Sequence, residues 1–485
     1  MEVKKLLKVG DTLQSTMGVQ IKIEKLLSAK GGQGYVYLVD YGGAKKVLKW
    51  YKGTYLERLN KKIVRCDWQG GVKKFTVPDA PNDKSISTLE AFYNNLCNNT
   101  RNKPSDLGHF FVWPLDVTTW HPGSTSSFGY IMDVIDTKAY RELGEFYMFN
   151  ARFESRHEML TCCLNIAEAF RRLHLNGLSY QDLSGGNIYV DPNTGNIRIA
   201  DNDNVTPNEV SLGIGGTPGY IAPEIELGYA PDKYSDRFSL ALILFKIMMG
   251  GVHPFEGVYS REEGGWVSKN KDPLFIFDET DHRNAPTPDM HKNAMILWPQ
   301  YPEYIKALFR RTFKCKMDLS DIKKTDTETG KLMTIYTDIN RTKRPLEEEW
   351  IRALIQLRGE MVDCPKCKKT PVFLNIKQAV VCPNCKTPLT VPCKVKCGNA
   401  ALPIVPGSVV YRCQIDASCR DFGKGVMKLL VNKVDKRMGL GNMSEEAWQV
   451  EYFDGKTVTT PSRSVAEFKM GMKIYVGSHC LEITK

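Results

Sequence analysis

The 485-residue sequence lacks a continuous apolar segment long enough to cross a membrane. Its longest apolar run, Ser239 to Val252, is interrupted by Lys246, whereas a membrane-spanning helix needs ~20 apolar residues. The first residues also lack the apolar stretch of a secretory signal. We therefore expect a soluble, cytoplasmic protein with no membrane partner. A chain of this length favours two or three domains over a single core.

A strong charge excess is also missing from most of the chain. Residues 1–358 carry 47 basic and 44 acidic side chains, while residues 359–485 carry 19 and 11. Eight of the fourteen cysteines fall between Cys364 and Cys419. This clustering argues against a chain-wide disulfide framework and for a local metal module. A basic tail can contact nucleic acid, but a mildly basic soluble surface is more common, so nucleic acid is not the expected partner.

The apolar patterns predict two lobes. Alternating apolar residues between 20 and 50, separated by glycine turns, predict an antiparallel meander. Later segments follow in chain order: a polar insertion at 52–84, a helix from Ser87 to about Pro104, strands at 110–117 and 128–135, and helices around 160–173, 236–249, 304–313 and 346–357. Strands followed by helices indicate an α+β arrangement of two lobes, ending near residue 360.

The glycine-rich turn Lys30-Gly-Gly-Gln-Gly is the first motif that suggests chemistry. Gly31 and Gly34 let backbone amides approach a phosphate, and Val36 would cover a flat base. Lys49 ends a later apolar strand, where an inward-facing lysine needs partners such as an α/β-phosphate and a helix glutamate. Glu90 is the candidate for that glutamate. The alternative is that Ser87-x-x-Glu90 is only a helix capping box.

The most informative segment runs from residue 178 to 203. Asp182 and Asn187 are five residues apart, and Asp201 ends the next predicted strand. These are hard oxygen ligands, so Asn187 and Asp201 can hold Mg²⁺ on a triphosphate while Asp182 accepts a hydroxyl proton. An ordinary hairpin with polar turns is the alternative. Two later motifs, Gly216-Thr-Pro-Gly-Tyr-Ile-Ala-Pro-Glu224 and Tyr234-Ser-Asp-Arg-Phe-Ser, count against that alternative.

With these motifs in order, residues 20–358 resemble a eukaryotic-type (Hanks-type) bacterial Ser/Thr protein kinase domain. The resemblance implies an N-lobe at 1–135, a C-lobe at 136–358, ATP with Mg²⁺ or Mn²⁺ as cofactors, and phosphoryl transfer to Ser/Thr hydroxyls of a protein substrate. It implies a catalytic set of Asp182, Lys49, Asn187 and Asp201. It implies nucleotide contacts from Gly31, Gly34, Val36, Lys49, Glu90, the gatekeeper Met132, and the backbone of Asp133 and Ile135. It also implies a structural pair of Glu224 and Arg344, with Asp236 structural as well.

The departures from the family pattern leave a second function open. Tyr180-Gln181 stands where the family has His-Arg, so a phosphorylated activation loop would lose its arginine partner. Ser184 replaces a lysine, and Asn202-Asp203 replaces Phe-Gly, with Asp203 a further carboxylate near the metal. The alternative is a pseudokinase that binds nucleotide and assembles a complex. The surviving catalytic set favours an active kinase, because this chemistry is mostly positioning and charge stabilisation.

The cysteines of the tail have metal-ligand spacing. Cys364-Pro-Lys-Cys367 and Cys382-Pro-Asn-Cys385 are separated by 14 residues. Four thiolates fill a tetrahedral shell, so this spacing predicts a structural zinc in a zinc ribbon at 359–395. The four cysteines with looser spacing leave a second metal open: Cys393, Cys397, Cys413 and Cys419. Cys413 lies in an apolar stretch and fits a core position better.

Alternation after Met427 predicts a small all-β sandwich at 396–485. Gly439-Leu-Gly-Asn-Met-Ser and Met470-Gly-Met-Lys-Ile-Tyr-Val-Gly resemble the second half of a forkhead-associated domain. The Arg, Ser and His of that family's phosphate pocket have no recognisable positions, which favours a scaffolding sandwich. The whole layout resembles kinases of tellurite-resistance-type operons. It implies a von Willebrand type A protein and a metal-dependent phosphatase as partners.

Overall fold

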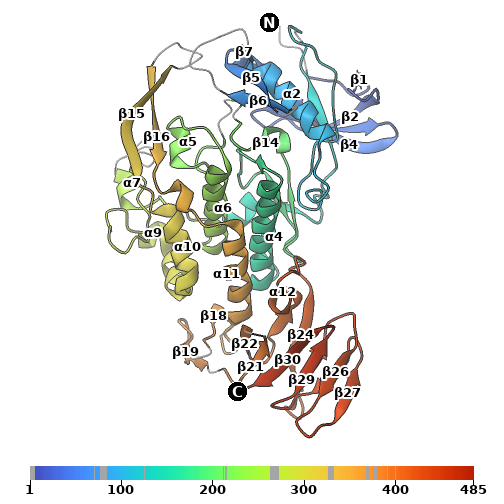
Figure 1. Ribbon diagram of the computed structural model, residues 1–485, viewed down its shortest axis with the longest axis vertical. Coiled ribbons are helices and arrows are strands. Elements are labelled where there is room, and N and C mark those ends of the chain that lie inside the picture. Colours follow the sequence, from blue (N-terminus) through green and yellow to red (C-terminus); the bar gives the residue numbers. More distant parts are fainter. Residues whose placement is uncertain are drawn as a thin grey trace.

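The computed structural model describes residues 6–69, 72–76, 85–124, 126–210, 212, 216–262, 272–325, 332–367, 371–375, 379–389, 391–398 and 400–485. Its parts are stacked along one long axis, with the first lobe, the helical second lobe and the tail in succession (Figure 1). The first lobe contains a six-stranded antiparallel sheet of order β1-β2-β3-β4-β9-β8. These strands are β1 Thr12–Gln14, β2 Gln20–Ser28, β3 Gly34–Tyr41, β4 Ala44–Tyr51, β8 Asp116–Val117 and β9 Gly129–Met132.

The segment expected as a polar insertion contributes to the core of this lobe. It forms helix α1 (Gly53–Asn60) and strands β5 (Ile63–Gln69) and β6 (Val72–Thr76), and residues 77–84 lie outside the described part. Tyr55, Leu56 and Leu59 of α1 are buried. They pack with helix α2 (Thr88–Arg101), which follows the short strand β7 (Ser85–Ser87). An apolar stripe within a mostly polar segment is therefore what fixes α1 against α2.

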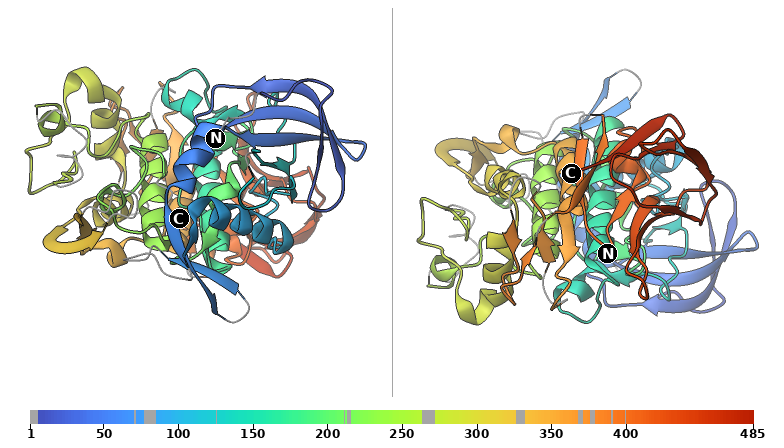
Figure 2. Two further views of the ribbon diagram at one scale, coloured as in Figure 1. Left: turned by 90° about the horizontal axis from the view of Figure 1, so that it is seen from above. Right: turned by 90° about the horizontal axis from the view of Figure 1, so that it is seen from below.

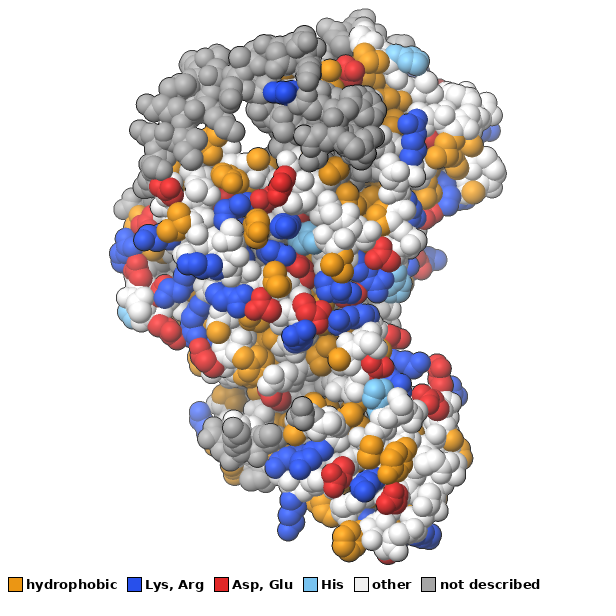
Figure 3. Space-filling model, viewed as in Figure 1, with side chains coloured by type: hydrophobic (Ala, Val, Ile, Leu, Met, Phe, Trp, Pro, Cys, Tyr) orange, Lys and Arg blue, Asp and Glu red, His pale blue; other side chains and the backbone are white. Residues whose placement is uncertain are grey.

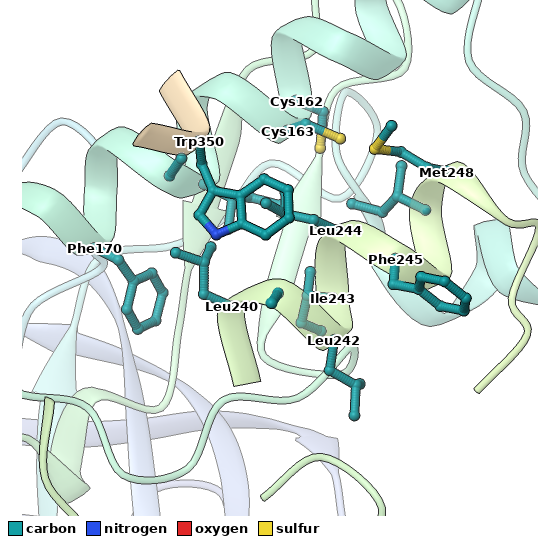
Figure 4. Close-up of a cluster of buried hydrophobic side chains, with 14 of the residues drawn as sticks. Cys162, Cys163, Phe170, Leu240, Leu242, Ile243, Leu244, Phe245, Met248 and Trp350 are labelled. Carbon is teal, nitrogen blue, oxygen red and sulfur yellow. The ribbon is translucent and has the colours of Figure 1, made fainter. Parts of the chain in front are cut away.

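The second lobe is built around helix α6 (Lys233–Met248), which is buried almost all round. Trp350 of α11 (Glu347–Glu360) lies over Leu240 and Leu244 of α6, beside Cys162 of α4 (Arg156–Leu175) (Figure 4). The remaining helices are α3 Leu143–Tyr147, α5 Pro223–Glu226, α7 Val258–Glu262, α9 Pro288–Leu297 and α10 Glu303–Phe313, with short 3-10 turns η1 Asn202–Asn204, η2 Trp298–Gln300 and η3 Arg341–Lys343. The continuous apolar run of the sequence therefore becomes the central helix of a lobe.

Short strands in the second lobe position the loops that carry polar motifs. Strands β12 (Ile188–Val190) and β13 (Ile197–Ile199) pair with each other, and β12 also pairs with β10 (Arg141–Glu142). Strand β11 (Leu178–Ser179) pairs with β14 (Thr206–Pro207). The loop between β11 and β12 and the turn after β13 are thus held at one end of the lobe. A long hairpin, β15 (Met317–Thr325) and β16 (Leu332–Asp338), lies elsewhere in this lobe.

The tail consists of two small hairpins followed by a two-sheet sandwich. The hairpins are β17 Met361–Asp363 with β18 Pro371–Phe373, and β19 Val380–Val381 with β20 Pro388–Leu389. One sheet has the order β22-β21-β30-β29-β26-β27, and the other has the order β23-β24-β25-β28. Their bounds are β21 Cys393–Cys397, β22 Ala400–Ile404, β23 Val409–Tyr411, β24 Gly425–Val431, β25 Met438–Asn442, β26 Trp448–Glu451, β27 Thr457–Thr460, β28 Val465–Glu467, β29 Lys473–Val476 and β30 His479–Thr484.

Both sheets of the sandwich contribute to one core. Leu429 and Leu440 come from the four-stranded sheet, and Trp448 and Ile474 come from the six-stranded sheet. Strand β21 begins at Cys393, three residues before the boundary expected from the sequence. In the view from below, the tail strands lie nearest the viewer, beneath the helical lobe (Figure 2).

The tail packs directly on the second lobe. Arg358, near the end of α11, is buried, and its guanidinium donates to the hydroxyl of Thr161 at 2.8 Å and to the carbonyl of Phe422 at 2.6 Å. The same group lies 3.7 Å from the ring centroid of Tyr411. Phe422 and Cys413, which lies in helix α12 (Arg412–Ile415), belong to the hydrophobic core of the second lobe. Body and tail therefore share a packed interface.

No helix in the described part of the chain is long and apolar enough to span a membrane. On the face shown in Figure 3, basic and acidic side chains are interspersed over the helical lobe. This distribution agrees with the nearly balanced charge of residues 1–358 and differs from the single-sign surface that favours nucleic acid.

Candidate active site

The loop between β11 and β12 is held by a carboxylate from the central helix. Asp236 of α6 accepts hydrogen bonds from the backbone N–H of Tyr180 at 2.7 Å and of Gln181 at 3.0 Å. Its Oδ2 also lies 3.1 Å from Nε2 of His174, whose Nδ1 lies 2.9 Å from Glu347. Although burial alone would lower it, these two carboxylates raise the pKa of His174 to about 9. Asp236 therefore has the structural role that the sequence predicts.

Asp182 follows directly and is almost fully buried. Its Oδ1 accepts a hydrogen bond from the hydroxyl of Thr217 at 2.7 Å, and its Oδ2 accepts one from the amide of Asn204 at 3.2 Å. Burial raises the pKa of Asp182 to about 6, and the neighbouring carboxylates of Asp203 and Asp201 add to this effect. A fixed carboxylate with a raised pKa can accept a proton from a hydroxyl near neutral pH.

Asn187 and Asp201 lie at the ends of the two paired strands, as their sequence positions predict. The side-chain amide of Asn187 donates to the backbone carbonyl of Asp182 at 2.9 Å. Asp201 has a left-handed backbone with φ 55°, and Gln181 has φ 69°. Non-glycine residues rarely adopt this conformation, and such strain concentrates at functional sites. The side chain of Asp201 is 37% exposed, so its carboxylate oxygens can reach a ligand in the site.

Lys49 brings the first lobe to this site. Its Nζ lies 3.2 Å from Oδ1 of Asp201, 3.1 Å from Oδ2 of Asp203, and 3.0 Å from Oε1 of Gln33 in the glycine-rich turn. The lysine is buried. Burial alone would lower the pKa of Lys49, but the charges of Asp201 and Asp203 raise it overall, so the ammonium group stays charged.

The expected pairing of Lys49 with Glu90 requires a correction. Within the described residues no ion pair joins Glu90 to Lys49, and the buried partner of the lysine is Asp203. Glu90 lies in the first turn of α2, where its backbone N–H donates to the hydroxyl of Ser87 at 3.1 Å. Ser87 therefore caps α2 through the backbone of Glu90, which is one half of the capping box that the sequence offered as the alternative. The sequence could not distinguish pairing with Lys49 from helix capping, because both need a glutamate at position 90.

The residues expected to contact a nucleotide lie on the first lobe beside Lys49. Val36 and Met132 pack with the cluster of apolar side chains that also includes Ile135. Asp133, directly after β9, is exposed and its carboxylate pairs with Lys46 at 2.6 Å. The glycines serve close approach, since a Cβ on Gly34 would lie 2.8 Å from the carbonyl oxygen of Trp50. A Cβ on Gly31 would lie 3.3 Å from the carbonyl oxygen of Gly34.

Gln181 is a neutral residue that holds the segment after Asp201 in place by hydrogen bonds. Its side-chain amide donates to the carbonyl of Val210 at 2.8 Å and to the hydroxyl of Ser179 at 3.1 Å. It also contacts the hydroxyl of Thr206. The position that the family fills with arginine therefore carries a neutral group that already has partners in the protein.

The structural pair predicted for the second lobe is present. Glu224 and Arg344 form two hydrogen bonds, of 2.8 and 3.0 Å, and neither side chain is exposed. Arg344 also donates to Asp338 at 2.9 Å. The pair joins α5 to the segment before α11.

The four cysteines with zinc spacing converge between the two small hairpins. Their Sγ atoms, those of Cys364, Cys367, Cys382 and Cys385, all lie within 4.8 Å of one another. The Sγ atoms of Cys364 and Cys385 are 3.6 Å apart, and those of Cys367 and Cys382 are 3.7 Å apart. A tetrahedral zinc with Zn–S bonds of ~2.3 Å separates its sulfurs by about 3.8 Å. The donor set and its spacing therefore fit a metal.

The other four tail cysteines do not form such a cluster within the described residues. Cys393 and Cys397 contact backbone carbonyls of Ile404 and Ile415, and Cys413 is buried in the core of the second lobe. The second metal left open by the sequence thus has no converging set of ligands in the described part of the chain.

Tyr51 and Asn204 are among the residues of the site that were missed in the sequence. Tyr51 lies two positions after Lys49 on the same strand, so it shares the inward face of β4, and its hydroxyl donates to Asp203 at 2.6 Å. The alternation of side chains along a strand could therefore have predicted that Tyr51 faces the site. Asn204 offered no such signal, because its bond to Asp182 depends on the shape of the turn η1.

Lys49 of the first lobe thus lies beside Asp201 of the second, and Asp182 and Asn187 come from one loop of that second lobe. A family model described as the protein kinase domain matches residues 124–320. This range includes Asp182, Asn187 and Asp201, while Lys49 precedes it. The matched region contains both helices and strands, and it is similar to a protein kinase domain.

Curated relatives agree with the family model. Protein kinase YegI of Escherichia coli K12 is 24% identical over 220 residues, covering 42% of this chain and 29% of that protein. The DNA damage-responsive serine/threonine-protein kinase RqkA of Deinococcus radiodurans is 33% identical over 107 residues, 20% of this chain and 15% of that protein. Mouse cGMP-dependent protein kinase 2 is 31% identical over 100 residues, 20% and 13% respectively. The chain thus spans less than a third of the length of each of these relatives.

Proposed function

We propose that the protein transfers the γ-phosphoryl group of ATP to a Ser or Thr hydroxyl of a partner protein. The observation that carries the proposal is the convergence of Lys49, Asp182 and Asp201, with Lys49 Nζ 3.2 Å from Asp201 and Asp182 fixed by Thr217 and Asn204. The matched kinase domain and the kinase names of the relatives support it.

Each residue has a role that its position supports. Lys49 orients the α/β-phosphates by its buried positive charge. The amide oxygen of Asn187 and the carboxylate of Asp201 are the ligands for Mg²⁺ or Mn²⁺. The metal ion would neutralise charge on the triphosphate. Asp182 holds the acceptor hydroxyl in line and takes up its proton. Val36 and Met132 cover the base, and the backbone after β9 at Asp133 and Ile135 bonds to its edge.

Purified protein with labelled ATP and Mg²⁺ or Mn²⁺ tests this assignment. Asp182→Asn and Lys49→Met are expected to lower transfer by at least about 10³-fold, since each removes a group needed for positioning. Asp191→Asn is the matched control, because Asp191 lies in the turn between β12 and β13 and its carboxylate bonds to Asn193 and Thr194 of that turn. Full activity in either active-site variant would overturn the assignment. Phosphoamino-acid analysis then decides between Ser/Thr and Tyr.

The sequence left open a scaffold that binds nucleotide without transfer. The same assay separates the two functions: nucleotide binding with no labelled product, alone or with candidate partners, would favour the scaffold. The carboxylate of Asp182 and the charged Lys49 favour transfer, because a scaffold has no need of a fixed proton acceptor.

We further propose that the tail binds a structural zinc ion through Cys364, Cys367, Cys382 and Cys385 and that the sandwich selects the protein partner. The sulfur distances of 3.6 and 3.7 Å support the zinc. A von Willebrand type A protein and a metal-dependent phosphatase are the partners to test first by co-purification with the full chain. A forkhead-associated-like sandwich, a bacterial origin and a cytoplasmic location belong to the same proposal.

A further inference from the structure

The turn after Asp201 contains a second carboxylate that is fully buried. Asp203, in η1, has no exposed side-chain surface. Its Oδ2 lies 3.1 Å from Nζ of Lys49 and accepts a hydrogen bond from the hydroxyl of Tyr51 at 2.6 Å. Both donors come from strand β4 of the first lobe. A buried carboxylate needs compensation by charge and hydrogen bonds, and here both come from the other lobe.

Tyr51 is itself held in place by surrounding rings. Its ring centroid lies 5.8 Å from that of Tyr55 in α1, 5.2 Å from that of Phe92 in α2 and 5.2 Å from that of Phe128 just before β9. The contacts with Phe92 and Phe128 are edge-to-face, a favourable arrangement for aromatic rings. The phenol that binds Asp203 therefore has little freedom to move. Through it, the core of the first lobe fixes the turn that follows Asp201.

Helix α2 does not supply the carboxylate for Lys49. Glu90 is on that helix, but its described contact is the backbone bond to Ser87. Both carboxylates within reach of Lys49, Asp201 and Asp203, come from one short turn of the second lobe. The turn at 201–203 thus fixes the position of Lys49 and also carries Asp201, the carboxylate proposed to bind the metal.

We propose that Asp203 is the positioning residue for Lys49, in the role first assigned to Glu90. The proposal rests on the proposed nucleotide-binding function of this site. Asp203 would act through the lysine, whose Nζ lies 3.1 Å from its Oδ2. The direct consequence is that the active arrangement of Lys49 depends on the turn at 201–203 and on Tyr51, and not on a movement of helix α2.

A double-mutant cycle on nucleotide affinity tests the proposal. The affinity of the full chain for a fluorescent ATP analogue with Mg²⁺ is measured for Asp203→Asn, Lys49→Met and the double variant. We expect Asp203→Asn to weaken binding by about tenfold or more, because a charge-assisted hydrogen bond is lost. In the Lys49→Met background the same substitution should change the affinity by less than about twofold. A merely structural role would give additive effects instead, and additivity would overturn the proposal.

A second pair of variants keeps the test readable if Asp203→Asn does not fold. Tyr51→Phe removes the hydroxyl bonded to Asp203, and we expect several-fold weaker nucleotide binding. Tyr55→Phe is the matched control, since the hydroxyl of Tyr55 is buried in the same aromatic cluster and has no hydrogen bond within the described residues. Equal effects of the two substitutions would contradict the proposal, and so would a loss in Glu90→Gln as large as that in Asp203→Asn.

Failure of the proposed function has a different signature. Wild-type protein that binds nucleotide but transfers no phosphoryl group would overturn the kinase assignment, while the binding cycle would still report on Asp203. Wild-type protein that does not bind nucleotide at all would overturn both.

Discussion

Arg344 and Glu224 lie 120 positions apart in the chain and form a two-pronged ion pair with both side chains fully buried. The separations are 2.8 and 3.0 Å. Such a pair gives modest net stability, but removal of one partner leaves an uncompensated buried charge. Arg344 also donates to Asp338 at 2.9 Å, so loss of Arg344 would remove a partner from two buried carboxylates. Glu224 would keep a longer ion pair with Arg341, at 3.8 Å.

Arg344→Met should therefore lower the free energy of unfolding by about 3–5 kcal/mol. Urea unfolding followed by fluorescence measures this. Arg311→Met is the control, because the Arg311–Glu349 pair has similar bond lengths but side chains that are 44% and 36% exposed. We expect Arg311→Met to lower the free energy of unfolding by less than about 1 kcal/mol. Comparable losses in the two variants would contradict the argument from burial.

His174 should make the stability of the second lobe depend on pH. Its pKa is raised from the ordinary 6.5 to about 9, since the bonds to Asp236 and Glu347 outweigh the effect of burial. Folding therefore binds a proton, and the contribution is complete below pH 6.5 and is lost as the pH rises through 9. The full effect is about 3 kcal/mol.

Urea unfolding of wild type and His174→Gln at pH 6, 7, 8 and 9 tests this prediction. The difference in stability between the two should shrink as the pH rises, because only the wild type loses the bound proton. A difference that stayed constant from pH 6 to 9 would show that His174 does not titrate in this range.

Zinc in the tail should be present at one ion per chain and should depend on the four converging cysteines. Cys364→Ser is expected to reduce bound zinc and to make the remaining thiols reactive, since structural zinc holds its ligands deprotonated and shielded. Elemental analysis and thiol titration measure both effects. Cys480→Ser is the control, because Cys480 is exposed and outside the cluster. Unchanged zinc content in Cys364→Ser would exclude this ligand set.

Arg358→Ala should loosen the joint between body and tail. The substitution removes the bonds to Thr161 and Phe422 and the contact with the ring of Tyr411. We expect faster amide hydrogen exchange around α12 and Phe422 and a loss of about 2–4 kcal/mol in stability. Arg352→Ala on the same helix is the control, since Arg352 is 78% exposed. Unaltered exchange at α12 would show that other contacts hold the joint.

The sequence predicted the helices better than the short strands. The helix expected at 236–249 is α6, Lys233–Met248, because a run that is apolar all round has to be buried. The strand expected at 110–117 is reduced to Asp116–Val117. Phe110 and Phe111 are buried in the second lobe instead, where Phe111 forms a bridge with Ile199. Apolar residues alone did not reveal which lobe would bury them.

The geometry of the site was predictable where the chemistry depends on sequence spacing. Asp182, Asn187 and Asp201 flank two strands that pair, so their order already brings them together. The partner of Lys49 was not predictable, because Glu90 and Asp203 are distant in sequence and only the burial of the turn 201–203 decides between them. The packing of Arg358 against the tail was equally hidden, since all of its partners lie in other segments.

The joint at Arg358 leaves no linker between body and tail, since α11 ends at Glu360 and β17 begins at Met361. A binding module on a flexible tether raises the local concentration of its partner and lets it sample many orientations. A module fixed in this way holds its partner at a constant distance and orientation from the body. If the sandwich holds the substrate as proposed, only hydroxyls at one distance and angle from Asp182 would be presented. The choice of acceptor would then follow from the partner's shape rather than from residues flanking the hydroxyl.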